Sequence, residues 1–75
     1  MTTEEKIKQV ESIHRSILSQ EISCNIQREI EWYKQEMSPE RDRLIAELEA
    51  EGVHIKLNYA SSLFNGGPAI EVVEA

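Results

Sequence analysis

Hydrophobic residues recur at a helical spacing through the first half of the chain, but the face that they occupy rotates. Residues 3–37 contain no Gly or Pro and are rich in Glu, Lys, Gln and Ile, a composition typical of helix. At about 100° per residue, the apolar positions of residues 7–18 span roughly −120° to +20°, and those of residues 22–37 span roughly 60° to 140°. A supercoil absorbs only about 20° per heptad. We therefore predict a break between Ser19 and Asn25 and an αα-hairpin of helices 3–18 and 22–37; one kinked helix in a dimer is the alternative.

A third helix is indicated directly after the second. Ser38, Pro39 and Glu40 stand in the order of a capping residue, a first-turn proline and a first-turn acid. Leu44, Ile45 and Leu48 would form the apolar face of this helix, and Gly52 is a natural terminator. The sequence thus predicts a short helix over residues 39–51.

After Gly52 the period of the pattern changes from 3.6 to 2. Apolar and polar residues alternate over 53–59, a loop with the run Asn-Gly-Gly-Pro covers 60–68, and a second alternating segment spans 69–73. We expect these two strands to pair as an antiparallel hairpin over the helices. The predicted fold is a single small α+β domain, residues 1–75, with three helices followed by a C-terminal β-hairpin.

Composition narrows the function classes. The chain has 75 residues, one Cys and a net charge of −6, which argues against a nucleic-acid-binding or anionic-membrane surface. No apolar run approaches the roughly 18–20 residues of a membrane span, and the acidic start is unlike a signal peptide. With one cysteine, a reducing cytoplasm is the expected location. A chain this short buries little core, so we also expect a homodimer.

The negative charge is concentrated in residues 29–51, where eight acids stand against three bases and leave −5 of the total −6. Acids in the last turns of the predicted third helix oppose the helix dipole, and such conflicts sometimes mark function. Trp32 lies about 120° from the apolar stripe of its helix, as expected for a partner contact. The predicted partner-binding residues are Trp32, Glu40, Asp42, Glu47, Glu49 and Glu51. The alternatives are a solvated acidic surface, and a Trp32 covered by the rest of the fold.

Residues able to carry chemistry are isolated. His14 lies in the apolar arc of the first helix and is expected to be partly buried and hydrogen-bonded, and Cys24 is expected to be a small buried residue. No spacing suits a metal site, a nucleophile with its base, or a phosphate loop. We expect no catalysis, no metal and no cofactor.

The leading hypothesis is a non-enzymatic interaction protein, a regulator or inhibitor that binds a basic protein surface through its acidic helical face. Proteins of this kind are often supplied by phages and mobile elements. One alternative is a winged-helix DNA reader with residues 39–51 as its recognition helix, although the acids there oppose groove entry. Another is a homo-oligomer that binds a small ligand, with Trp32, Tyr33 or Tyr59 stacking on it.

Overall fold

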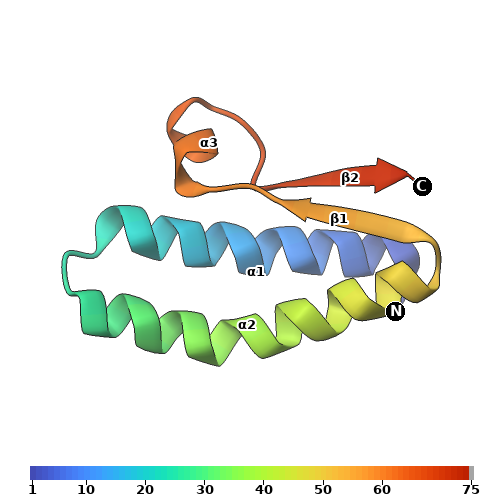
Figure 1. The fold of residues 1–75 in the computed structure, drawn as a ribbon, viewed down its shortest axis with the longest axis horizontal. Coiled ribbons are helices and arrows are strands. Elements are labelled where there is room, and N and C mark those ends of the chain that lie inside the picture. Colours follow the sequence, from blue (N-terminus) through green and yellow to red (C-terminus); the bar gives the residue numbers. More distant parts are fainter. Residues whose placement is uncertain (75) are drawn as a thin grey trace.

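The computed structural model describes residues 1–74 and contains two long helices and a small sheet (Figure 1). The elements are α1 (Thr3–Ser23), α2 (Gln27–Ala50), β1 (Val53–Leu57), α3 (Ala60–Phe64) and β2 (Ile70–Glu74). The long helices lie side by side as an antiparallel pair (Figure 1). Of the remaining elements, β1 packs mainly against α2, and α3 and β2 pack against α1. The predicted α+β fold, an αα-hairpin followed by an antiparallel β-hairpin, is confirmed.

The first helix begins where the sequence indicates and runs further than expected. The Thr2 side chain accepts a hydrogen bond from the Glu5 backbone N–H, and two acids occupy the first turn. The helix continues past the predicted end at residue 18 to Ser23, and the chain turns over residues 24–26. The predicted break between Ser19 and Asn25 therefore holds, but its helical boundaries move to 23 and 27. Cys24 ends α1 and is half-buried rather than buried.

The predicted boundary between helices 22–37 and 39–51 is wrong. A single helix, α2, covers Gln27–Ala50 with Pro39 inside it, and it bends along its length (Figure 1). Packing of the apolar side of the helix outweighs the local capping pattern at residues 38–40. A helix continued at about 100° per residue keeps residues 30, 33, 37, 44 and 48 on one side. Pro39 lies on the exposed side, so water can reach the Gln35 carbonyl that loses its hydrogen bond.

Replacing Pro39 by alanine should stabilise the protein by about 2 kcal/mol. An interior proline costs a helix about 3 kcal/mol relative to alanine, and the more flexible unfolded chain of the variant offsets up to about 1 kcal/mol. Equilibrium unfolding in urea measures the difference. A loss of stability would contradict the continuous helix, because proline is favoured at the first position of a separate one.

The two strands pair in antiparallel register, with His54 opposite Val73 and Leu57 opposite Ile70. Gly52, at φ +86°, makes the turn from α2 into β1, a conformation that favours glycine. The strands occupy 53–57 and 70–74 rather than the predicted 53–59 and 69–73, and the predicted loop contains the short helix α3. Its extra turn keeps Leu63 partly buried, which the alternating pattern does not show.

The core lies where the inward faces of α1, α2 and the sheet meet. It combines fully buried side chains of both helices with the first residue of β2, namely Val10, Ile13, Ile17, Leu44, Leu48 and Ile70. The sheet covers only part of the helical pair, and the end formed by the α1–α2 turn extends beyond it (Figure 1). This uncovered stretch borders a cleft lined by both long helices and by residues 57–59.

Candidate functional site

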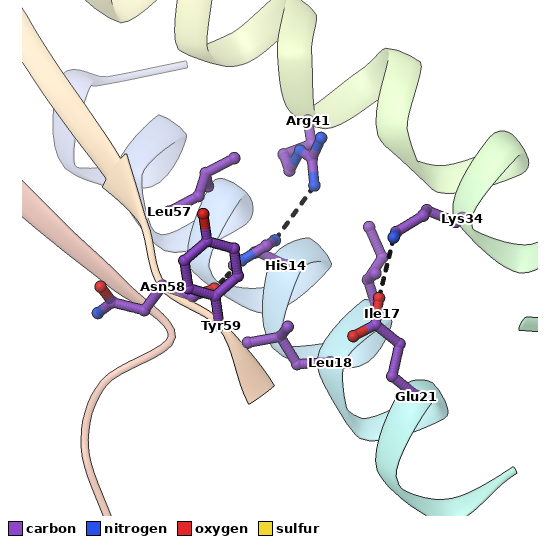
Figure 2. A pocket seen from close by; sticks show the side chains of 9 residues that line it. All are labelled: His14, Ile17, Leu18, Glu21, Lys34, Arg41, Leu57, Asn58 and Tyr59. Atoms are coloured by element: carbon purple, nitrogen blue, oxygen red, sulfur yellow. Dashed lines mark hydrogen bonds and ion pairs between the residues drawn. The ribbon is translucent and has the colours of Figure 1, made fainter. Parts of the chain in front are cut away.

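A cleft of about 330 Å³ lies between α1, α2 and the segment 57–59, which contains the end of β1 and the two residues after it (Figure 2). Its apolar surface comes from Ile17 and Leu18 of α1 and from Leu57, and its polar groups come from all three segments. The polar lining residues are His14, Glu21, Lys34, Arg41, Asn58 and Tyr59. The cleft has the concave shape and mixed lining of a small-ligand pocket, near the lower end of the usual size range.

His14 links the three segments from within the cleft. Its side chain is only 6% exposed, its Nε2 lies 2.8 Å from the Asn58 carbonyl oxygen, and its Nδ1 lies 3.2 Å from Nη1 of Arg41. A guanidinium can only donate, so Nδ1 must accept from Arg41. The proton of the neutral ring is therefore on Nε2, which donates to the Asn58 carbonyl. The expectation of a partly buried, hydrogen-bonded His14 is confirmed.

The surroundings of His14 favour its neutral form. Burial lowers the pKa of the imidazole below its ordinary value of 6.5, and the Asn58 carbonyl opposes this shift. Among the charged groups nearby, Arg41 and Lys34 lower the pKa and Glu21 raises it. Protonation would also place a donor at Nδ1 against the Arg41 guanidinium. The geometry and the electrostatics therefore agree on a neutral ring at pH 7.

Asn58 fixes the third side of the cleft. Its backbone N–H donates to the Ala69 carbonyl at 3.0 Å, and its side-chain amide donates to the Pro68 carbonyl, also at 3.0 Å. The Ser62 hydroxyl donates to the same Pro68 oxygen at 2.9 Å. These bonds join the two ends of the connection between the strands, residues 58–69, which contains α3. The Asn58 carbonyl is thereby held in place to accept the hydrogen bond from His14.

The rim of the cleft is charged on one side and aromatic on the other (Figure 2). Lys34 of α2 forms an ion pair with Glu21 of α1, with Nζ and Oε1 3.0 Å apart. Tyr59 lines the opposite side although its side chain is 82% exposed. Arg41 lies deeper, with its side chain 13% exposed, and its Nη2 pairs with Asp42 at 3.0 Å.

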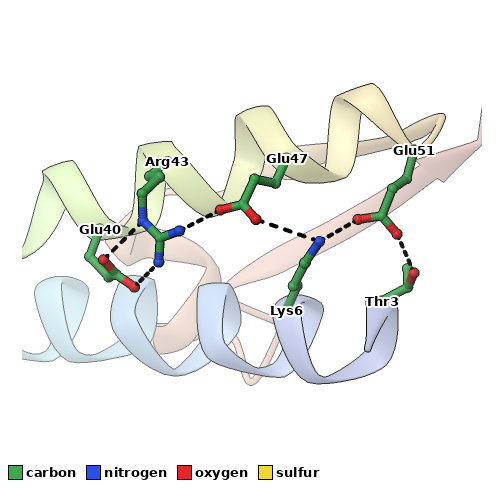
Figure 3. Close-up of polar contacts among 6 residues, drawn as sticks. All are labelled: Thr3, Lys6, Glu40, Arg43, Glu47 and Glu51. Carbon is green, nitrogen blue, oxygen red and sulfur yellow. Dashed lines mark hydrogen bonds and ion pairs between the residues drawn. The ribbon is translucent and has the colours of Figure 1, made fainter. Parts of the chain in front are cut away.

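The predicted acidic residues fall into two groups. Glu40, Glu47 and Glu51 belong to a chain of ion pairs between the C-terminal half of α2 and the start of α1 (Figure 3). Arg43 joins Glu40 at 2.6 Å and Glu47 at 2.5 Å. Lys6 lies 2.6 Å from Glu51 and 3.6 Å from Glu47. These three carboxylates therefore already have cationic partners within the protein.

The other predicted acids lie elsewhere on α2. Asp42 is paired with Arg41, and Glu49 is exposed without an ion pair among residues 1–74. At about 100° per residue, Asp42 and Glu49 lie roughly 160° around the helix from Glu40 and Glu47. The structure thus does not bring the six predicted residues together on one face.

Replacing Glu51 by glutamine should lower the thermal midpoint at pH 7. The Lys6 ammonium, and then the Thr3 hydroxyl, lower the pKa of this carboxyl by hydrogen bonding to it. A lowered pKa in the folded state contributes stability above the ordinary value of 4.5, and this stability is lost as the pH falls through the folded-state pKa. Melting curves should show a deficit at pH 7 that narrows at pH 3. Glu49→Gln is the control, and an equal deficit there would contradict the pairing.

Trp32 is exposed, and no other element of residues 1–74 covers it. Its side chain is 61% exposed on the side of α2 that faces away from α1. Glu29 and Glu36 flank it three and four residues away, and neither forms an ion pair in the described chain. We call Glu29, Trp32 and Glu36 the Trp32 surface.

Comparison with known proteins gives no family. No family model, curated protein or solved structure matches this chain. Across residues 1–74, no helix has the length and apolar character to cross a bilayer, and no three acidic, His or Cys side chains are grouped to hold a metal.

Three residues of the cleft were not predicted from the sequence, namely Arg41, Lys34 and Glu21. The predicted helix start at residue 39 separated Arg41 from Met37, although on a continuous helix Arg41 lies on the same side as Met37 and Leu48. A cation inside an apolar stripe was the available signal. Asn58 and Tyr59 lie close to the cleft residues of α1 and α2 because of how the sheet packs on the helices, and no local sequence pattern predicts that packing.

Proposed function

We propose that the protein is a non-enzymatic interaction module that binds a basic surface of another protein through the exposed side of α2. The observation that carries this proposal is Trp32, which is 61% exposed and lies between two carboxylates that form no ion pair within residues 1–74. Exposing a large aromatic side chain leaves apolar area in water, and tryptophan is enriched among residues that dominate binding energy.

The charge around Trp32 supports a basic partner. A Lys or Arg side chain of the partner can lie over the indole ring, where the cation is attracted to the π-system. The same cation can then pair with Glu29 or Glu36 beside the ring. Regulation or inhibition would follow from occupying a basic surface that another acidic ligand needs, and the cytoplasm is the proposed setting.

The paired acids are less suited to this role. Glu40, Glu47 and Glu51 would have to release Arg43 or Lys6 before they could bind a partner. Reversing Glu47 and Glu51 would therefore test the ion pairs within the protein as well as any partner. The proposed contact is accordingly the Trp32 surface, with the exposed Glu49 and the paired acids contributing mainly long-range attraction.

Affinity capture with matched variants tests the proposal. Immobilised wild type should retain a basic protein from extracts of the source cell in a salt-sensitive way, with Trp32→Ala and the double variant Glu29→Lys, Glu36→Lys retaining at least tenfold less. The control is Glu31→Lys with Glu49→Lys, the same charge change on another side of α2. Equal loss in the control, or full retention by Trp32→Ala, would contradict the proposal.

Two alternatives remain, a winged-helix DNA reader and a self-associating protein, and the structure bears on them differently. The winged-helix reading requires residues 39–51 as a separate recognition helix, and they are the second half of α2. Self-association stays a prediction, supported by the unpaired outer edges of the two-stranded sheet and by Val72 and Val73, each 48% exposed. Light scattering across a wide concentration range measures it, and a constant monomer mass would contradict it.

A further inference from the structure

The cleft combines a fixed cation with an apolar lining. Arg41 is held at Nη1 by His14, and its position is therefore set before any ligand arrives. Ile17 and Leu18, 2% and 4% exposed, supply an apolar floor below it. A ligand that fits both features needs an anionic group and an apolar body.

Charge distinguishes among anions. Lys34 and Arg41 give the lining two positive charges, and each already has an acidic partner, Glu21 at 3.0 Å and Asp42 at 3.0 Å. An anion reaches Arg41 by displacing Asp42. A singly charged group then replaces the charge of Asp42 one for one, whereas a doubly charged phosphate would add a further negative charge beside Glu21. The planar guanidinium also suits a carboxylate, which it can bind with two parallel hydrogen bonds after displacing the exposed Asp42.

Tyr59 indicates the nature of the apolar body. Its ring borders the cleft in Figure 2 and is 82% exposed, so little of its surface is used for packing in the fold. An aromatic ring in the cleft could stack against it while resting on Leu18 and Leu57. The cavity of about 330 Å³ limits the ligand to a small molecule.

We propose that this cleft binds a small aromatic carboxylate, with Arg41 and Lys34 holding the carboxylate and Tyr59 covering the ring. The site is distinct from the Trp32 surface, because Arg41 and Lys34 lie on the side of α2 that faces α1, and Trp32 lies on the opposite side. Binding in the cleft and capture of a partner can therefore succeed or fail separately.

Titration with benzoate, followed by two-dimensional NMR, tests the site. Benzoate should bind in the millimolar range expected for so small a ligand and shift the signals of His14, Lys34, Arg41 and Tyr59. Benzamide, which has the ring without the charge, and acetate, which has the charge without the ring, should each bind at least fivefold more weakly. Equal binding of either compound, or shifts scattered outside the cleft, would overturn the proposal.

Two variants with a control locate the binding groups. Arg41→Gln should weaken benzoate binding about tenfold, because a charge-assisted pair is lost. Arg28→Gln removes the same charge from the exposed side of α2 and should leave the affinity unchanged. Since Arg41 also holds His14, Tyr59→Ala provides a second variant whose exposed side chain can be removed without loss of packing, and it should weaken binding about threefold. Unchanged affinity in Tyr59→Ala, or equal losses in the Arg41 and Arg28 variants, would overturn the assignment.

Discussion

Replacing Leu48 by alanine is expected to destabilise the protein by about 3 kcal/mol, the largest effect of any single change considered. Leu48 is completely buried and packs in the cluster that joins both long helices to β2. Truncating such a side chain loses its transfer free energy and leaves a cavity, at a combined cost of roughly 2–5 kcal/mol. A domain of this size has a total stability of roughly 4–11 kcal/mol, so the variant loses a large fraction of it.

Urea unfolding followed by circular dichroism measures this loss as a shift of the midpoint at unchanged slope. Ile22→Ala is the matched control, because Ile22 is 37% exposed near the end of α1 and should lose less than about 1 kcal/mol. A loss at Leu48 as small as the one at Ile22 would contradict the assignment of Leu48 to the core. A loss at Ile22 as large as the one at Leu48 would instead indicate a partner or second copy that covers Ile22 in solution.

Replacing His14 by alanine should cost about 2 kcal/mol at pH 8. The Asn58 carbonyl would lose its donor, and Nη1 of Arg41, whose side chain is only 13% exposed, would lose its acceptor, while the bond to Asp42 remains. Leaving a buried polar group without a partner costs roughly 1–3 kcal/mol. The loss should appear in urea unfolding.

His14 should also make the stability of the wild type depend on pH. Its pKa is lower in the folded protein than the ordinary 6.5, so below pH 6.5 the unfolded chain binds more protons. The stabilisation is complete above pH 6.5 and declines as the pH falls towards the folded-state pKa. The slope for one proton cannot exceed about 1.4 kcal/mol per pH unit.

Urea unfolding at a series of pH values between 8 and 5 measures this dependence. The His14→Ala variant should show a flatter curve over that interval, because the group that takes up the proton is absent. His54→Gln, which changes the exposed histidine of β1, should retain the curve of the wild type. A flat curve for the wild type would contradict a neutral His14 in the folded protein.

The fold was largely predictable because the positions of apolar residues around each helix and along each strand can be calculated from the sequence. The rotation of the apolar stripe located the turn between the long helices, and the change of period located the hairpin. The error at Pro39 arose because a capping pattern is local, whereas the shared side of Met37, Leu44 and Leu48 acts over the whole helix and packs against α1. Burial of that side outweighs the cost of one interior proline on the exposed side.

The candidate sites were predictable only in part. The position of Trp32 away from the apolar stripe indicated an exposed side chain, because a helix fixes where each residue lies around its axis. Which carboxylates form ion pairs was not predictable, since Lys6 and Glu51 are brought together by helix pairing across 45 residues of sequence. The cleft likewise depends on Asn58 reaching His14, 44 residues away.

The order of the elements bears on how the chain folds. The two long helices pack against each other and are joined by the short turn at residues 24–26. The two strands likewise pair with each other and are joined by residues 58–69. Such local contacts form early and rapidly, because little entropy is lost in closing short loops. Val10 and Ile70, at opposite ends of the sequence, join the core only when the two hairpins dock. That docking is the expected transition state for folding, and substitutions at Ile70 should slow folding more than those near the helical turn.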